Sequence, residues 1–98
     1  MIIRWTPTAL ADLQQVHAYI GADNPEAAVE SVDEILAAIE MLQQHPELGH
    51  RGRVPRTREL VVGRYIVAYR IHRDAVELLG ILHSARRWPD SFRPRGKR

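Results

Sequence analysis

The sequence predicts a single α+β domain in which a helical hairpin packs on a mainly antiparallel four-stranded sheet, in the order βααβββ. Two segments in the first half of the chain carry apolar residues at intervals of three or four, the spacing of amphipathic helices. Three short apolar runs in the second half are separated by tight-turn sequences, which is typical of an antiparallel meander. A β-branched run at the start supplies the fourth strand.

Composition narrows the class of protein. The 98 residues have an ordinary globular balance, with 45% hydrophobic and 27% charged side chains, and they contain no cysteine. Disulfides and thiolate metal sites are therefore excluded. No apolar run approaches the roughly 18 residues of a membrane span, and the start of the chain lacks the pattern of a signal peptide. We therefore expect a cytoplasmic protein that makes no membrane contact.

The net charge of +2 conceals a strong separation of charge along the chain. Residues 1–50 carry one Arg and eight acids, which gives −7, whereas residues 51–98 carry thirteen Lys or Arg and four acids, which gives +9. The second half is thus expected to meet a polyanion or an acidic partner. Attraction between the two halves of the folded chain explains the same pattern, and both can hold together.

A first strand is expected over residues 2–5, followed by a helix over residues 7–21. Thr6 can accept from the first free amides of this helix, and Pro7 has the backbone geometry of a first helical position. The apolar stripe of the helix contains Ala9, Leu10, Leu13, Val16, His17 and Ile20. His17 is interpreted as a packed or boundary histidine rather than a ligand, and polar positions such as Asp12 are expected to face away.

A second helix is expected over residues 24–44, because Asn24-Pro25 repeats the same start signal and Pro46 disfavours helix before it. The link to the first helix is short, so the two should form an antiparallel hairpin. The apolar stripe of the second helix contains Ala28, Val32, Ile35, Ile39 and Leu42. Its carboxylates are interpreted as a solvated face, since neither helix offers a catalytic set.

Residues 45–58 form the longest stretch expected to be irregular, because two Gly and two Pro interrupt it. A flexible basic loop can bind phosphates or acidic side chains. The loop lacks the GxxxxGK[ST] spacing of a P-loop, so no nucleotide site is predicted. The arginines of this loop are Arg51, Arg53, Arg56 and Arg58.

The three remaining strands are expected over residues 59–62, 65–71 and 76–82, joined by turns at residues 63–64 and 72–75. The last run is almost continuously apolar, as in a strand that is covered on both faces or lies centrally in the sheet. The predicted core consists of Leu13, Val16, Ile20, Val32, Ile35, Ile39, Leu42, Val67, Tyr69, Leu78 and Leu82.

The last strand changes abruptly into a polar, basic exit over residues 83–88. A central strand that delivers His83, two Arg and Trp88 to one edge of a sheet can build a site. The alternative is a strand that runs into a solvated basic tail. Residues 93–98 contain only Pro, Gly and basic side chains, so we expect a single domain over residues 1–92 and a disordered basic tail after it.

Little other chemistry is visible. No histidine pairs with another ligand at metal-binding spacing, no paired carboxylates occur, and the serines lack a nucleophile context, so no metal and no cofactor are predicted. What remains is His83 with Arg58, Arg70, Arg86 and Arg87. Such a set could cleave RNA, with the His as acid or base and the Arg stabilising the charged transition state. It could equally be a basic docking surface without chemistry.

Four stretches resemble, in their order and spacing, the RelE/ParE superfamily of bacterial type II toxins: TPTALADLQQVHAYI, LQQHPELGHRGR, TRELVVGRYIVAYRI and VELLGILHSARRWP. The resemblance covers roughly residues 2–89. It implies a βααβββ fold and a small cytoplasmic toxin that a cognate antitoxin wraps and neutralises. It also implies contact with operator DNA only through the antitoxin, and a homodimer would fit.

The superfamily divides by target. RelE-like members cut messenger RNA in the ribosomal A site, whereas ParE-like members inhibit DNA gyrase. The RelE-like pattern has an Arg after the strand Tyr, where this chain has Ile66 after Tyr65, and it has Lys residues in the preceding strand, where residues 59–62 have none. It also ends in a catalytic Tyr, where this chain has Trp88 and Phe92.

These departures favour the interpretation that the chain is ParE-like, that is, a gyrase inhibitor without enzymatic activity. The alternative is a ribosome-dependent mRNA endoribonuclease with His83 as its catalytic residue. The residues expected to bind the target or the antitoxin are Arg51, Arg53, Arg56, Arg58, Arg70, Arg86, Arg87 and Trp88.

Overall fold

The computed structural model describes residues 1–84 and confirms the α+β class and the expected order of elements. The sheet has five strands rather than four, in the order β1-β5-β4-β3-β2. The elements are β1 (Ile2–Trp5), α1 (Pro7–Gly21), α2 (Pro25–Met41), β2 (His50–Arg51), β3 (Arg58–Val62), β4 (Tyr65–His72) and β5 (Ala75–His83).

The unpredicted strand is β2, which lies inside the stretch expected to be irregular. A tight turn over residues 52–57 folds the chain back, so that His50 pairs antiparallel with Glu59 and Arg51 with Arg58. The Gly and Pro residues break the segment without preventing this short pairing. The expected irregularity was therefore wrong for these two residues.

Both helices begin as their capping residues predict. The Thr6 side chain accepts from the Ala9 amide at 3.1 Å, the Asn24 side chain accepts from the Ala27 amide at 3.0 Å, and a proline follows each cap. The second helix ends at Met41, earlier than the expected residue 44, because residues 42–44 continue as turns. Neither described helix is long and apolar enough to cross a membrane.

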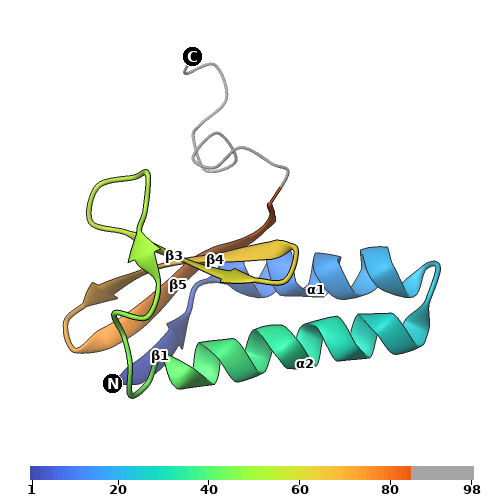
Figure 1. Cartoon of the computed structure of the whole chain (residues 1–98), viewed down its shortest axis with the longest axis horizontal. Coiled ribbons are helices and arrows are strands. Elements are labelled where there is room, and N and C mark those ends of the chain that lie inside the picture. Colours follow the sequence, from blue (N-terminus) through green and yellow to red (C-terminus); the bar gives the residue numbers. More distant parts are fainter. Residues whose placement is uncertain (85–98) are drawn as a thin grey trace, which may run out of the picture.

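The helical hairpin covers one face of the sheet (Figure 1). In Figure 1 the helices lie side by side, and the turn between them is at the end away from β1. β5 is an interior strand, second from the β1 edge of the sheet, and it pairs antiparallel with β4 and parallel with β1. The last apolar run thus has a strand on each side, although the middle strand of the five is β4.

The main core lies between the hairpin and the sheet, and most of its predicted members are buried. Leu13, Ile20 and Val32 are only half-buried, and Leu82 packs with Ala68 in a second cluster. The buried face of α1 is narrower than expected, since Leu10 and His17 are exposed. The core members in the main cluster are Ala9, Val16, Ile35, Ile39, Leu42, Val67, Tyr69, Val76, Leu78 and Ile81.

Hydrogen bonds to Tyr69 hold the loop after α2 against the core. The buried hydroxyl of Tyr69 donates to the Pro46 carbonyl at 2.7 Å and accepts from the Gly49 amide at 2.9 Å. A side chain at Gly49 would lie 2.8 Å from the Tyr69 ring. The loop after α2 is therefore held closely against the sheet at Pro46 and Gly49.

Candidate functional site

A cleft of about 690 Å³ lies between α1 and the end of β5, where His83 is found. Its wall combines apolar side chains with a carboxylate, an amide, two phenols and an imidazole, a mixture suited to holding a partner's side chain or a polar ligand. The lining residues are Asp12, Gln15, Val16, Ala18, Tyr19, Tyr65, Ile81, Leu82 and His83.

The cleft exists because β1 is shorter than β5. Pairing with β1 ends at Leu78, so the next part of β5 has no strand on that side. There α1 replaces the strand: the Thr6 hydroxyl donates to the Leu78 carbonyl at 2.7 Å, and the Asp12 carboxylate accepts from the Ile81 amide at 3.0 Å. Asp12 is half-buried, so the expectation that it faces away was wrong.

His83 and Tyr65 form the aromatic part of the cleft. They are cross-strand partners at the end of the β4–β5 ladder, and their rings meet edge to face with centroids 5.4 Å apart and planes at 83°. Both residues are half-buried. An imidazole and a phenol in contact are groups that can exchange protons or dock a partner.

Two of the arginines predicted beside His83 are engaged elsewhere. Arg58 donates to the carbonyls of Gly49 at 2.6 Å and Glu47 at 3.3 Å, which makes it a structural residue of the loop. Arg70 forms an ion pair with Glu77, and this contact lowers the pKa of the Glu77 carboxyl. Arg58 is paired with Tyr69, well along β4 from the Tyr65 end, so the expected cluster of Arg58 and Arg70 with His83 does not form.

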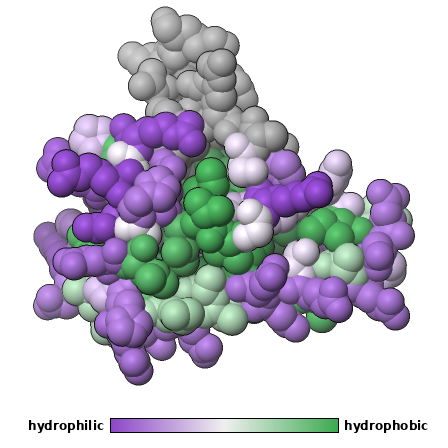
Figure 2. Space-filling view, viewed as in Figure 1, coloured by the Kyte–Doolittle hydropathy of each residue, from purple (hydrophilic) through white to green (hydrophobic). Residues whose placement is uncertain are grey.

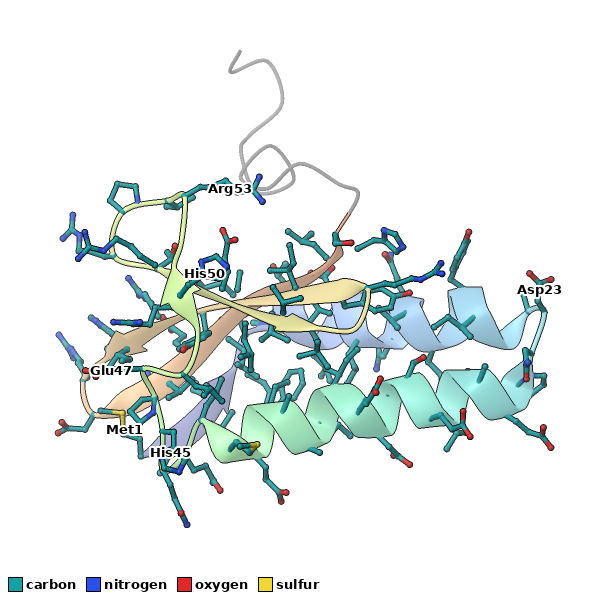
Figure 3. All side chains as sticks on the ribbon, in the orientation of Figure 1. Met1, Asp23, His45, Glu47, His50 and Arg53 are labelled. Atoms are coloured by element: carbon teal, nitrogen blue, oxygen red, sulfur yellow. The ribbon has the colours of Figure 1, made fainter. Side chains whose placement is uncertain are left out.

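Of the other described arginines of the prediction, Arg51 ends β2, and Arg53 and Arg56 lie on the loop between β2 and β3. Arg51, Arg53 and Arg56 are all exposed. Figure 3 shows Arg53 at the outer end of this loop and His50 nearer the sheet. Figure 2 shows apolar surface in the middle of the same view, over the β3–β4 region, with hydrophilic side chains around it. A charged loop thus lies beside an apolar surface.

The comparisons decide the family. A family model described as the ParE toxin of the type II toxin–antitoxin system parDE matches residues 3–88. The chain belongs to this family. Y4kP of Sinorhizobium fredii is 45% identical to the toxin over 89 residues, covering 89% of this chain and 92% of Y4kP. Toxin RelE3 of Caulobacter vibrioides is 36% identical over 85 residues, covering 83% of this chain and 91% of RelE3.

A solved structure agrees with this assignment. The chromosomal ParDE toxin–antitoxin system from P. aeruginosa contains a chain that matches the toxin with a TM-score of 0.78 and 26% identity. The match covers 85% of this chain and 95% of that chain. The resemblance to RelE/ParE toxins is thereby confirmed, and the toxin is one component of a type II module with an antitoxin as its partner.

Part of the predicted site of the toxin lies outside the described residues, namely Arg86, Arg87 and Trp88, as does the tail expected over residues 93–98. Within residues 1–84 the structure contains no group of three side chains that could hold a metal ion. The described part of the site therefore consists of the His83 cleft and the exposed arginines of the β2–β3 loop.

Sequence reasoning missed Asp12 and Tyr65 as members of the cleft. A signal for Asp12 was present, because it lies three residues after Ala9 and four before Val16, the spacing of one helix face. A carboxylate on a buried face requires a hydrogen-bond partner. Tyr65 gave no such signal, since an aromatic residue in a strand is ordinarily a core residue.

Replacing Asp12 with alanine in the toxin is expected to reduce the free energy of unfolding by about 1–3 kcal/mol, since the Ile81 amide loses its acceptor in a partly buried position. Replacing Gln14, an exposed residue of the same helix, should change it by less than about 0.5 kcal/mol. Urea denaturation of both variants measures the difference. Equal stability of the two would show that the edge of β5 does not depend on Asp12.

Proposed function

We propose that the toxin inhibits DNA gyrase in the cytoplasm without cleaving RNA, and that its antitoxin binds it through an acidic segment that folds on binding. The observation that carries this proposal is the placement of the arginines. A nuclease would place Arg58 and Arg70 around His83. In this fold Arg58 instead holds the loop before β2, and Arg70 forms an ion pair with Glu77 of β5.

The chemical argument concerns the phosphate. Cleavage beside a 2′-hydroxyl requires a base for that oxygen, a donor for the leaving oxygen, and cations on the phosphate. His83 and Tyr65 supply groups that can carry protons, but an arginine bound to carbonyls or to a carboxylate is poorly placed to stabilise a transition state some distance away. The described cleft is thus better suited to docking than to phosphate chemistry.

The substitution of the strand arginine supports the same conclusion. Ile66 stands at the position after Tyr65 where RelE-like nucleases have an Arg, and only 6% of its surface is exposed. It pairs with Leu82 across β4 and β5, where the side chains of both residues are buried. A buried aliphatic side chain at this position contributes no charge to a phosphate.

The alternative function is a ribosome-dependent mRNA endoribonuclease, and one feature of the site favours it. His83 and Tyr65 are in ring contact beside a cleft, an arrangement that could serve as an acid–base pair. Relatives named RelE2 and RelE3 match the chain as well. In this alternative His83 is the catalytic residue.

A test in cells separates these functions. The full chain is expressed from a tight promoter, with and without the antitoxin encoded by its neighbouring gene, and its level is confirmed by blot. We expect growth to stop without the antitoxin and to resume with it, because the antitoxin covers the basic surface. Plasmid DNA from the arrested cells should lose negative supercoiling, while messenger RNA should stay intact.

Each other outcome contradicts part of the proposal. Normal growth at a confirmed protein level would contradict toxicity. Arrest with unchanged plasmid supercoiling and with codon-positioned breaks in messenger RNA would contradict the gyrase target and favour the endoribonuclease.

A further inference from the structure

We infer that Arg51, at the end of β2, and the loop of residues 52–57 between β2 and β3 are a preformed contact for the backbone phosphates of duplex DNA. This inference adds a second component, the DNA on which gyrase acts, and rests on the proposed function for its biological role. Its physical basis is separate. It consists of a loop held by its own hydrogen bonds, two exposed arginines that form no ion pair within residues 1–84, and a loop sequence without aromatic side chains.

The loop is held by its own hydrogen bonds. The Gly52 amide donates to the Thr57 carbonyl at 2.8 Å, and the Thr57 hydroxyl and amide both donate to the Val54 carbonyl, at 2.7 and 3.2 Å. A Cβ at Gly52 would lie 2.3 Å from the Thr57 hydroxyl, so the turn closes as tightly as glycine permits. A rigid loop loses little conformational entropy when it binds.

The base of the loop is fixed to the sheet by a buried carboxylate. Only 2% of Glu59 is exposed, and its carboxylate accepts from the Arg53 amide at 3.2 Å. The Arg53 Nε lies 3.8 Å from the same carboxylate, and the His50 Nε2 lies 4.0 Å from its other oxygen. Arg53 thus helps to hold the loop on the sheet, and the Glu59 carboxylate partly compensates its charge.

Arg51 and Arg56 differ from Arg53, because neither forms an ion pair with any residue that the structure describes. Arg56 has a φ of +66°, a left-handed conformation that a non-glycine residue rarely adopts. Arg51 is the direct cross-strand partner of Arg58, and like charges in this position destabilise a sheet. A bound anion would relieve this repulsion.

The rest of the surface allows a polyanion to approach from this side. The acids of the first half are concentrated on α2, with Glu26, Glu30, Asp33, Glu34 and Glu40 all exposed. In Figure 3 the oxygen-tipped side chains of α2 project on the side away from the loop that carries Arg53. A long polyanion on the loop therefore need not pass over the acidic helix.

The composition of the loop favours duplex backbone over other polyanions. Residues 49–58 contain no Phe, Tyr or Trp, so the loop has no aromatic platform on which unpaired bases could stack. Its aliphatic residue, Val54, packs into the second cluster with Ala68 and Leu82 and is not available as an anchor for a peptide. What remains outside is charge, which is sufficient for contact with phosphates.

Binding of the full chain to a fluorescently labelled duplex of about 20 base pairs, followed by anisotropy between about 50 and 200 mM salt, tests the inference. The test variant is Arg51→Gln/Arg56→Gln. The control is Arg64→Gln/Arg73→Gln, which removes the same charge from two exposed turn residues, and Arg73 has a φ of +53° that matches Arg56. Thermal melting confirms that each variant is folded.

We expect the loop variant to lower the slope of log K against log salt by about 1.8 and to weaken binding at 0.1 M salt by about tenfold to a hundredfold, for the loss of two phosphate contacts. The control should change binding by no more than about twofold, since exposed charges farther away are screened. Arg51→Lys/Arg56→Lys should keep the salt slope. If the glutamine double variant does not fold, Arg51→Gln alone provides the test and should lower the slope by about 0.9.

Equal loss of affinity in the loop and control variants would overturn the inference, and so would tighter binding to a single-stranded RNA of the same length or to a polyglutamate peptide of the same charge. The measurement contains no gyrase. Failure here would leave the gyrase target standing, and failure of gyrase inhibition would leave the DNA contact standing.

Discussion

Replacing Tyr69 with alanine is expected to reduce the free energy of unfolding by about 3–5 kcal/mol, because the ring is completely buried in the main core. Replacing it with phenylalanine should reduce the free energy by about 1–3 kcal/mol, because only the hydroxyl is lost and the Gly49 amide is left without its acceptor. Comparison of the two variants by urea denaturation separates packing from loop attachment.

A matched control is Tyr19→Phe, since Tyr19 is 77% exposed and its hydroxyl should affect stability by less than about 0.5 kcal/mol. If Tyr69→Phe were as stable as the native chain, the account of how the loop after α2 is held would be wrong.

The same hydroxyl should make stability depend on pH in the alkaline range. Burial raises the pKa of Tyr69 above its ordinary value of 10.0, although the Gly49 amide and Arg58 oppose this shift. The folded state then keeps the proton to a higher pH than the unfolded state. The Tyr69 hydroxyl therefore contributes its full share of the free energy of unfolding below pH 10. This contribution is lost as the pH rises through the raised pKa. This loss should be absent from Tyr69→Phe.

The helices and the meander could be predicted because their signals are local. Thr6-Pro7 and Asn24-Pro25 mark both helix starts, and Gly63-Arg64 marks the β3–β4 turn. Gly63 has a φ of +59°, which a glycine accepts easily. Each of these residues determines the backbone structure only a few positions away along the chain, so the sequence alone is sufficient to locate the helix starts and the turn.

The features that were missed depend on partners distant in the sequence. The pairing of β2 requires a turn built from the Gly52 amide and the Thr57 side chain. Asp12 has its role because β1 ends early and exposes the Ile81 amide, 69 positions away. The arginines could not be sorted from the sequence for the same reason. Their charge is evident there, but only the folded chain shows that Arg58 binds carbonyls and that Arg70 binds a carboxylate.

Replacing His83 with alanine separates the two proposed functions by orders of magnitude. For a gyrase inhibitor that docks through arginines, we expect Ala at this position to leave inhibition nearly unchanged, with Arg86→Ala/Arg87→Ala as the variant that loses it. For a nuclease, loss of a general acid or base should reduce cleavage by about 10²–10⁴-fold. Inhibition is measured as the concentration of toxin that halves the supercoiling rate.

Folding must be checked in the same experiment, because removal of the edge-to-face contact with Tyr65 should reduce stability by about 0.5–1.5 kcal/mol. Tyr65→Ala removes the same contact and leaves the imidazole in place. Loss of inhibition in both variants, with a matching loss of folded protein, would reflect stability. Loss in His83→Ala alone would indicate that the imidazole itself acts.

The most direct test is to add the purified toxin to gyrase supercoiling reactions and, in parallel, to programmed ribosomes with a primer-extension readout. We predict that the toxin blocks supercoiling, that the antitoxin restores it, and that the messenger RNA on the ribosomes stays intact. Full supercoiling together with codon-positioned RNA breaks that vanish in His83→Ala would contradict the account and identify the protein as a ribosome-dependent nuclease.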